Sequence, residues 1–212
     1  MNAFSKTALY AGRTDLPPLV QRAVALANDV GFIHCCTPEQ GTLLQVLVRG
    51  RANGIIGETG TGCGAGLAWM ASAVGPDTRL VSVEIDAARA AACQTLFADR
   101  PNVTVLHGDW RLIEKFAPFD LLVLDGGGGG KRENDPPADP AALLKPGGTV
   151  VLDDFHPPME FWPEDAAARD EYGRSTTEPR AYWLQHPALF ATEVRVHPQV
   201  SAILGTRKAP RP

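Results

Sequence analysis

The stretch Ile55-Ile56-Gly57-Glu58-Thr59-Gly60-Thr61-Gly62-Cys63-Gly64 decides the fold. A short apolar run ends in an acid, and three glycines at alternate positions follow it. Because glycine has no β-carbon, the backbone can turn sharply there and approach a ligand closely. A helix expected at 64–74 would present free N–H groups at its N-terminus, and these favour an anionic group. The pattern predicts a strand, a ligand-binding loop and a helix in succession.

Strands and helices alternate on the C-terminal side of this unit. Apolar runs occur at 54–58, 79–84, 103–107, 119–125 and 149–153, separated by helix-like stretches at 64–74, 86–97, 110–116 and 140–145. Such alternation is typical of a parallel sheet with helices on both faces. After a helix expected at 179–186, the runs 191–197 and 200–206 predict a closing antiparallel hairpin. We therefore predict an α/β fold with a doubly wound, mostly parallel sheet.

Two helices precede the glycine stretch. Asp15-Leu16-Pro17-Pro18 opens a helix to about Asp29, with Gly31 as its stop. Thr37 and Gln40 are spaced as a capping box for a second helix that ends at Gly50. We expect a single domain over 1–212, in which residues 1–50 cover the site and 126–140 and 155–180 are mobile loops.

Composition argues against several classes of protein. The 212 residues carry a formal net charge of -4, which gives no footprint for nucleic acid or an anionic membrane. No run approaches the roughly 20 apolar residues of a membrane span, and the N-terminus has no apolar stretch suited to a secretory signal. The four cysteines form no C-x-x-C pair, so we expect buried thiols in a reduced compartment. The expected location is the cytoplasm.

Polar residues stand at the ends of successive predicted strands. Glu84 ends the second, Gly108-Asp109 follows the third and Asp125 ends the fourth. Ligands of open parallel sheets sit beyond these carboxyl ends, and the distance from the glycines to Glu84 suits a carboxylate that accepts hydrogen bonds from a ribose diol. A purely structural interpretation would make these acids helix N-caps or solvated ends. The four features together favour a nucleoside cofactor.

These motifs resemble a known family. Glu58 to Gly64, Val83-Glu84-Ile85-Asp86 and Gly108-Asp109 are similar to the motif series of class I S-adenosylmethionine-dependent methyltransferases. Pro38-Glu39-Gln40-Gly41, Leu122-Val123-Leu124-Asp125 and 146–154 resemble the cation-dependent catechol and caffeoyl-CoA O-methyltransferase branch. The resemblance implies a Rossmann-like, seven-stranded sheet whose last hairpin supplies the antiparallel strand.

The resemblance also implies roles for individual residues. The loop of Gly60, Thr61, Gly62 and Gly64 would face the methionine part of the cofactor, and Glu58 would orient that loop or the cofactor's amino group. Glu84 would hold the ribose hydroxyls. Asp109 and Trp110 would contact the adenine. The implied cofactor set is Glu58, Gly60, Thr61, Gly62, Gly64, Glu84, Ile85, Gly108, Asp109, Trp110 and Asp125.

The same branch implies a divalent cation at the acceptor. The matching ligands are Asp125, Asp153 and Asp154, and such hard oxygen ligands suit Mg²⁺ or Ca²⁺. Two departures stand out: Asp154 replaces the usual asparagine, and Gly128 stands where the family has lysine. Lys131 is the nearest lysine, either a base or acceptor-binding cation or an ordinary solvated residue. The catalytic candidates are Asp125, Lys131 and His156.

Other functions stay open. Gly60-x-Gly62-x-x-Ala65 also fits a loose dinucleotide fingerprint and hence an NAD(P)-dependent oxidoreductase, although no tyrosine is followed four residues later by lysine. A nucleic-acid or protein methyltransferase could share the fold, and Gly128 would suit a non-catalytic cofactor-binding module. We expect methyl transfer to an oxygen of a small molecule, with no membrane and no nucleic-acid partner. The N-terminal helices could form the contact of a homodimer.

Overall fold

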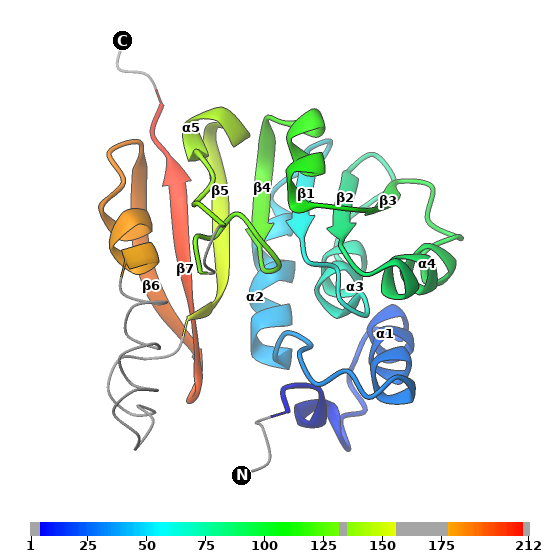
Figure 1. Ribbon diagram of the computed structural model, residues 1–212. Coiled ribbons are helices and arrows are strands. Elements are labelled where there is room, and N and C mark those ends of the chain that lie inside the picture. Colours follow the sequence, from blue (N-terminus) through cyan, green and yellow to red (C-terminus); the bar gives the residue numbers. More distant parts are fainter. Residues whose placement is uncertain (1–4, 132–134, 156–177, 210–212) are drawn as a thin grey trace.

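One seven-stranded sheet organises the chain in the order β3-β2-β1-β4-β5-β7-β6 (Figure 1). The computed structural model describes residues 5–131, 135–155 and 178–209. The strands are β1 Ile55–Thr59, β2 Arg79–Glu84, β3 Val103–His107, β4 Phe119–Leu124, β5 Leu144–Phe155, β6 Leu189–His197 and β7 Val200–Arg207. Strands β1 to β5 pair in parallel, and β7 is antiparallel to both β5 and β6. The predicted doubly wound sheet with its C-terminal hairpin is confirmed.

Helices cover both faces of this sheet. They are η1 Thr7–Tyr10, α1 Pro18–Asp29, α2 Pro38–Arg49, α3 Ala65–Ala71, α4 Ala87–Leu96, η2 Trp110–Phe116 and α5 Pro140–Leu143, and residues 178–185 are also helical. Helices α1 to α4 share one apolar cluster with Leu121 and Val123 of β4. Elements η2, α5 and 178–185 share a second cluster with Leu122 and Leu124. The alternation along β4 therefore sends its side chains into two separate cores.

The local signals for helix ends act as expected. Thr37 and Gln40 form the predicted capping box at the start of α2. Gly31 follows α1 with a φ of +67°, a conformation that glycine adopts without strain. In the part of the chain that the structure describes, no helix combines the length and apolarity needed to cross a bilayer.

The predicted boundary between α5 and β5 is wrong. The sequence predicted a helix at 140–145, but α5 ends at Leu143 and β5 begins at Leu144, which pairs with Phe119. A residue that precedes proline is driven out of the helical region, so Lys145 before Pro146 takes an extended conformation. An irregular step then restores the parallel register at Thr149, opposite Leu121. Strand β5 is therefore longer than the predicted 149–153.

The central strands end at the same level. Thr59, the last residue of β1, pairs with Val83 on β2 and with Leu124 on β4. The loops that leave these three strands consequently meet at one edge of the sheet. Figure 1 shows the N-terminal segment, drawn in blue, lying below that edge. This edge is where the polar residues predicted from the sequence converge.

We predict that Trp183 stabilises the second core by packing and by one hydrogen bond. Its ring is buried, and its indole N–H donates to the Gly129 carbonyl over 2.9 Å. Trp183→Phe leaves that carbonyl unpaired and should cost about 1–3 kcal/mol of unfolding free energy. Trp183→Ala should cost about 3–5 kcal/mol because it also opens a cavity.

Urea unfolding followed by circular dichroism measures both changes. Phe190→Ala is the matched control, because that aromatic side chain is 71% exposed and its loss should change stability by less than about 0.5 kcal/mol. Wild-type stability in Trp183→Phe would show that the hydrogen bond to Gly129 contributes nothing.

Candidate functional site

Thr59 joins the loops that follow β1 and β4. Its carbonyl accepts hydrogen bonds from the N–H groups of Asp125 and Gly126, at 3.2 and 2.7 Å, and its hydroxyl donates to the Gly127 carbonyl at 2.8 Å. The two backbones approach so closely that a β-carbon on Gly60 would lie 2.4 Å from the Gly126 nitrogen. Gly60 also has a φ of +83°. Both loops therefore require glycine at their point of contact.

A cleft of about 560 Å³ opens beside this contact. Its volume lies in the usual range for cofactor and small-molecule sites. Eight residues of the predicted cofactor set line it, namely Gly60, Gly62, Glu84, Ile85, Gly108, Asp109, Trp110 and Asp125. The fold thus brings together loops from four strand ends around one cleft.

The other three predicted residues lie elsewhere. Glu58 and Thr61 line a smaller adjoining cavity, together with Cys35, Cys36 and Asp125. Gly64 lines neither space. A β-carbon on Gly64 would meet the side chains of Phe97, Cys93 and Leu96, so this glycine permits the close packing of α3 against α4. Its role in the described structure is to open α3, with a φ of +86°.

Glu58 supports the glycine loop from below. Its Oε2 accepts a hydrogen bond from the Ser82 hydroxyl at 2.6 Å, and Ser82 Oγ lies 2.6 Å from Thr61 Oγ1. Burial raises the pKa of Glu58 to about 8; Ser82 opposes this shift, and the negative charge of Asp125 adds to it. A carboxyl group that stays protonated near neutral pH acts here as part of a buried hydrogen-bonded chain.

Glu84 is held at the end of β2 by three donors. Its Oε2 accepts the Gly62 N–H at 2.7 Å. Its Oε1 accepts the Asp86 N–H and the Arg89 guanidinium, both at 2.9 Å. The side chain is only 4% exposed but borders the cleft. The position predicted to hold a ribose is therefore an ordered carboxylate that faces the ligand space.

Asp109 has a structural as well as a candidate binding role. Its carboxylate caps η2 by accepting the Arg111 N–H at 3.0 Å, as a helix N-cap does. The same carboxylate forms an ion pair with the Arg111 side chain at 3.2 Å. More than half of the Asp109 side chain is exposed, and it borders the cleft. The capping interpretation and the binding interpretation are compatible at this residue.

Trp110 explains why glycine replaces lysine at position 128. The indole packs along the glycine run, so a β-carbon would lie 2.4 Å from it on Gly127 and 3.1 Å on Gly128. Gly128 also has a φ of +80°. Its N–H donates to the Asp135 carboxylate at 3.0 Å, and its carbonyl accepts the Ala138 N–H at 2.8 Å. A lysine at 128 would meet the indole and an unfavourable backbone conformation.

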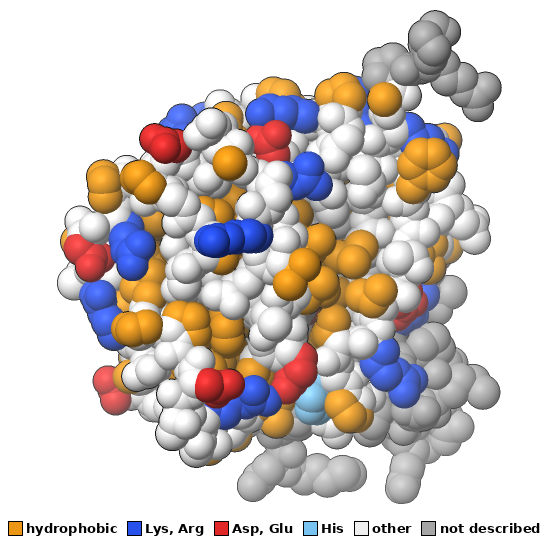
Figure 2. All heavy atoms as spheres, turned by 180° about the vertical axis from the view of Figure 1, so that it is seen from behind, with side chains coloured by type: hydrophobic (Ala, Val, Ile, Leu, Met, Phe, Trp, Pro, Cys, Tyr) orange, Lys and Arg blue, Asp and Glu red, His pale blue; other side chains and the backbone are white. Residues whose placement is uncertain are grey.

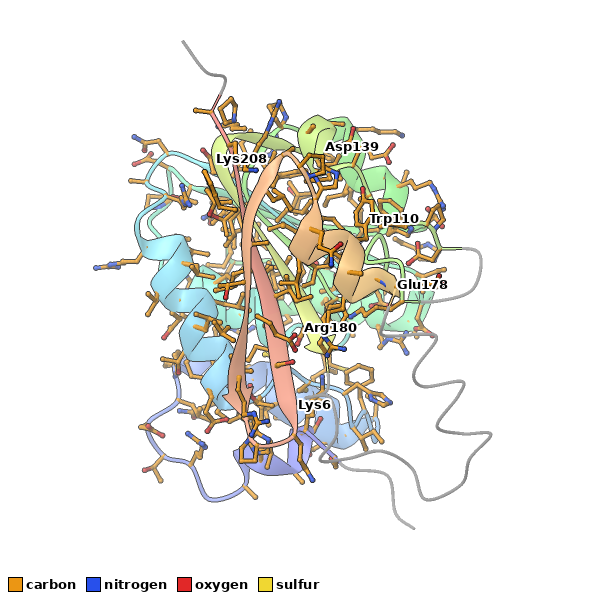
Figure 3. All side chains as sticks on the ribbon, turned by 90° about the vertical axis from the view of Figure 1, so that its left-hand side faces the viewer. Lys6, Trp110, Asp139, Glu178, Arg180 and Lys208 are labelled. Carbon is orange, nitrogen blue, oxygen red and sulfur yellow. The ribbon has the colours of Figure 1, made fainter. Side chains whose placement is uncertain are left out.

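Lys131 lies at the carboxyl end of β5. Its ammonium donates to the Asp153 carbonyl at 2.5 Å and stands 5.6 Å from the centre of the Phe155 ring. The Arg180 guanidinium lies 5.2 Å from the same ring and pairs with Glu193 at 2.9 Å. Figure 3 shows Arg180 beside the β6–β7 hairpin, on the side of the sheet that carries the helix at 178–185. Two cations thus flank the end of β5.

The metal set implied by the sequence is not assembled by the described residues. Asp125 directly follows β4 and Asp153 lies near the end of β5, whereas the Asp154 side chain and His156 lie outside the described residues. Within the described ranges, no group of three His, Cys, Asp or Glu side chains is placed to hold a metal ion. We therefore derive no chemical step through a metal.

Eight residues that line the cleft were not in the predicted set, namely Phe32, His34, Val83, Arg89, Arg111, Gly126, Gly127 and Asp135. Phe32 and His34 come from the segment between α1 and α2, far from the glycine loop in sequence. No local motif identifies them. Arg89 did carry a signal, because it lies in the first turn of the helix that follows the Glu84 strand.

Comparison with known proteins finds a similarity in the central part of the chain. Residues 58–155 match the family model of a methyltransferase domain. The matched part contains the end of β1, all of β2 to β5 and most of the lining of the cleft. The match favours methyl transfer over the dinucleotide alternative, and the methyltransferase resemblance predicted from the sequence is confirmed.

Solved structures share the fold over nearly the whole chain, beyond residues 58–155. An O-methyltransferase from Bacillus cereus in complex with SAH is 16% identical with a TM-score of 0.72, covering 95% of this chain and 96% of that one. The O-methyltransferase TomG from Streptomyces achromogenes, in complex with SAM, is 20% identical with a TM-score of 0.70 and covers 96% of each chain. No curated protein matches the sequence significantly.

We predict that Gly60→Ala destabilises the protein at the contact of the loops that follow β1 and β4. The added β-carbon would meet Gly126 backbone at 2.4 Å in a conformation with positive φ. The loss of unfolding free energy should exceed about 2 kcal/mol, because overpacking and backbone strain add. Gly75→Ala is the control, since a β-carbon there meets nothing within 4 Å. Equal stability of the two variants in urea would refute the close contact.

We predict that ionisation of Glu58 makes the protein less stable at alkaline pH. Its pKa of about 8 in the folded protein lies above the value of about 4.3 expected in an unfolded chain. The folded state therefore holds a proton that the unfolded state releases, and the contribution to stability present below about pH 4 is lost as the pH rises through 8.

Unfolding free energies of wild type and Glu58→Gln, measured from pH 5 to pH 9, test this. The wild type should lose up to about 1.4 kcal/mol per pH unit relative to the variant in this window. Parallel pH profiles for the two proteins would show that the Glu58 carboxyl group does not carry the effect.

Proposed function

We propose that the protein transfers the methyl group of S-adenosylmethionine to a hydroxyl oxygen of a small molecule. The observation that carries this proposal is the cleft at the carboxyl ends of β1, β2 and β4, lined by the paired glycine loops and by Glu84 within a methyltransferase domain. Structures of the same fold have been solved with SAM or SAH bound, which supports this choice of cofactor. Their description as O-methyltransferases supports oxygen as the acceptor atom.

The residues of the cleft suit the parts of this cofactor. Gly60 and Gly62 leave room for the methionine part, and Glu84 is the carboxylate available to the ribose hydroxyls. Asp109 and Trp110 would contact the adenine, with Ile85 and Gly108 beside them. The carboxylate of Asp125 also borders the cleft, and its negative charge favours a cationic ligand such as a sulfonium. These assignments use the eight predicted residues that line the cleft. Glu58 and Thr61 line the adjoining cavity, and Gly64 packs against α4.

The bound cofactor would supply an electrophilic methyl group on a positively charged sulfur. The protein then has to hold an acceptor hydroxyl in line with the carbon–sulfur bond and accept its proton. We assign proton removal to Asp125, which ends β4 beside the cleft. The acceptor O–H bond breaks, an oxygen–carbon bond forms, and the carbon–sulfur bond breaks to leave a neutral thioether. Lys131 would stabilise the negative charge that develops on the acceptor oxygen.

The distribution of charged side chains on the surface bears on the class of acceptor. Figure 2 shows basic side chains dispersed among acidic and apolar ones on the back of the molecule, which does not suit the track of a nucleic acid over that face. A small hydroxylated molecule fits this surface better than a polyanion. A homodimer formed through the N-terminal helices, and a requirement for Mg²⁺ or Ca²⁺, stay predictions.

Direct binding and turnover measurements test the proposed function. Calorimetric titration with SAM, SAH and NAD should show binding of the first two only, and mass spectrometry should find methylated products from a panel of catechols and phenols. The same assay with and without a chelator decides whether a divalent cation is needed. Tighter binding of NAD than of SAM would overturn the cofactor assignment. Tight SAM binding without turnover of any acceptor would support the non-catalytic module instead.

We predict that Lys131→Met lowers kcat by about 10²-fold or more while the Kd for SAM stays within a factor of two, because Lys131 lies outside the lining of the cofactor cleft. Asp125→Asn should also lower kcat. Lys208→Met is the control, since that ammonium donates to the Pro187 carbonyl and stands over Phe190. Unchanged kcat in Lys131→Met would remove this lysine from the mechanism.

A further inference from the structure

Glu84 has little capacity left for hydrogen bonds. A carboxylate offers about four acceptor positions on its two oxygens. In the structure, Gly62 N–H occupies one position on Oε2, and Asp86 N–H and Arg89 Nη2 together occupy Oε1. About one position therefore remains, on Oε2. The two neighbouring hydroxyls of a ribose require two.

Only one of the three donors is free to leave. The Gly62 N–H belongs to the glycine loop, which hydrogen bonds from Gly60 and Thr61 tie to the Val83 carbonyl on β2. The Asp86 N–H belongs to the N-cap residue of α4. Arg89 by contrast reaches Glu84 through a long side chain that is 33% exposed. Rotating the Arg89 side chain away from Glu84 costs far less free energy than moving either backbone segment.

The surroundings of Arg89 provide a place for its guanidinium. Arg89 borders both the cofactor cleft and a second groove of about 410 Å³, which is lined by Leu26, Val30 and Ala92 among others. Asp86 Oδ2 already pairs with Nη1 at 3.7 Å and can keep the guanidinium paired when it leaves Glu84. The Phe32 ring lies 5.5 Å below the guanidinium carbon and borders both spaces as well.

The present hydrogen bonding of Arg89 is also incomplete. Its Nε is buried and has no partner among the described residues. An unpaired buried donor costs free energy, so the guanidinium is not in a position that satisfies all its donors. The contact with Glu84 is therefore one of two side-chain positions that Arg89 can adopt.

We propose that Arg89 is a positioning residue that gates the ribose site: its guanidinium competes with the ribose hydroxyls for Glu84 Oε1 and moves toward Asp86 and the second groove when they bind. This inference rests on the proposed use of S-adenosylmethionine and adds a residue that controls its affinity. Because every binding event must first break the Arg89–Glu84 ion pair, the intrinsic affinity for the cofactor is reduced by the cost of that step.

The test measures binding of SAH by calorimetry to wild type, Arg89→Met and Arg89→Lys. Arg89→Met should bind SAH about two- to fivefold more tightly, the range expected when a partly exposed ion pair no longer competes. Its melting temperature should nevertheless fall, because Glu84 loses a charged partner. Arg89→Lys retains the competing charge and should bind close to wild type. A residue that merely supported the fold would lower stability and affinity together.

Salt provides a second measure that needs no variant. SAH carries no net charge near neutral pH, so added KCl acts mainly on the Arg89–Glu84 pair. Wild-type affinity should rise with KCl, whereas that of Arg89→Met should stay flat. Arg22→Met is the matched control: this arginine also contacts α4, through the Leu96 carbonyl at 2.9 Å, but does not touch Glu84. It should leave the Kd and its salt dependence unchanged.

The outcomes separate this inference from the proposed function. Weaker or equal SAH binding in Arg89→Met, or wild-type affinity that does not rise with KCl, overturns the gate and leaves the methyltransferase assignment intact. Wild-type protein that binds neither SAM nor SAH overturns the proposed function and the gate with it.

Discussion

The contact between Thr59 and the start of the second glycine run is the constraint on which the site depends. One residue accepts two backbone N–H groups and donates its hydroxyl to a third position, so the loops after β1 and β4 behave as a single unit. Their backbones pass so closely that neither Gly60 nor Gly126 leaves room for a β-carbon. The floor of the cleft is consequently built from main chain, and ligand atoms can approach it without meeting side chains.

The roles of the acidic residues around this cleft depend on their surroundings and not on their residue type. Glu58 is buried beneath the loop, and its pKa rises to about 8, so it serves the internal chain through Ser82 and Thr61. Glu84 faces the cleft and accepts hydrogen bonds from three donors. Asp109 is divided between capping η2 and bordering the cleft. Similar residues at successive strand ends thus perform different tasks because burial and donors differ.

An indole packs against the glycine run that follows β4. Trp110 contacts Gly127 and Gly128, and the Asp135 carboxylate accepts the Gly128 N–H. Lys131, which follows this run, donates to the Asp153 carbonyl near the end of β5. A positive charge therefore lies beside the end of β5. This arrangement links the unusual glycine run to the proposed chemistry.

The sequence by itself determined the succession of strands and helices, the glycine loop and the acids at the strand ends, because these depend on local backbone preferences and on apolar periodicity. It also indicated the methyltransferase family. It placed the end of α5 wrongly, since a buried pairing between Leu144 and Phe119 and the following proline outweighed the helical pattern.

Only the tertiary structure decided which of those residues share a cleft. Phe32 and His34 arrive from the segment between α1 and α2, and Gly64 turns out to serve packing against α4. The competition of Arg89 for Glu84 likewise depends on how many donors converge on one carboxylate, which no linear pattern records. Sequence spacing reports contacts along one element, whereas these contacts join segments far apart in the chain and arise only when the sheet and its helices pack together.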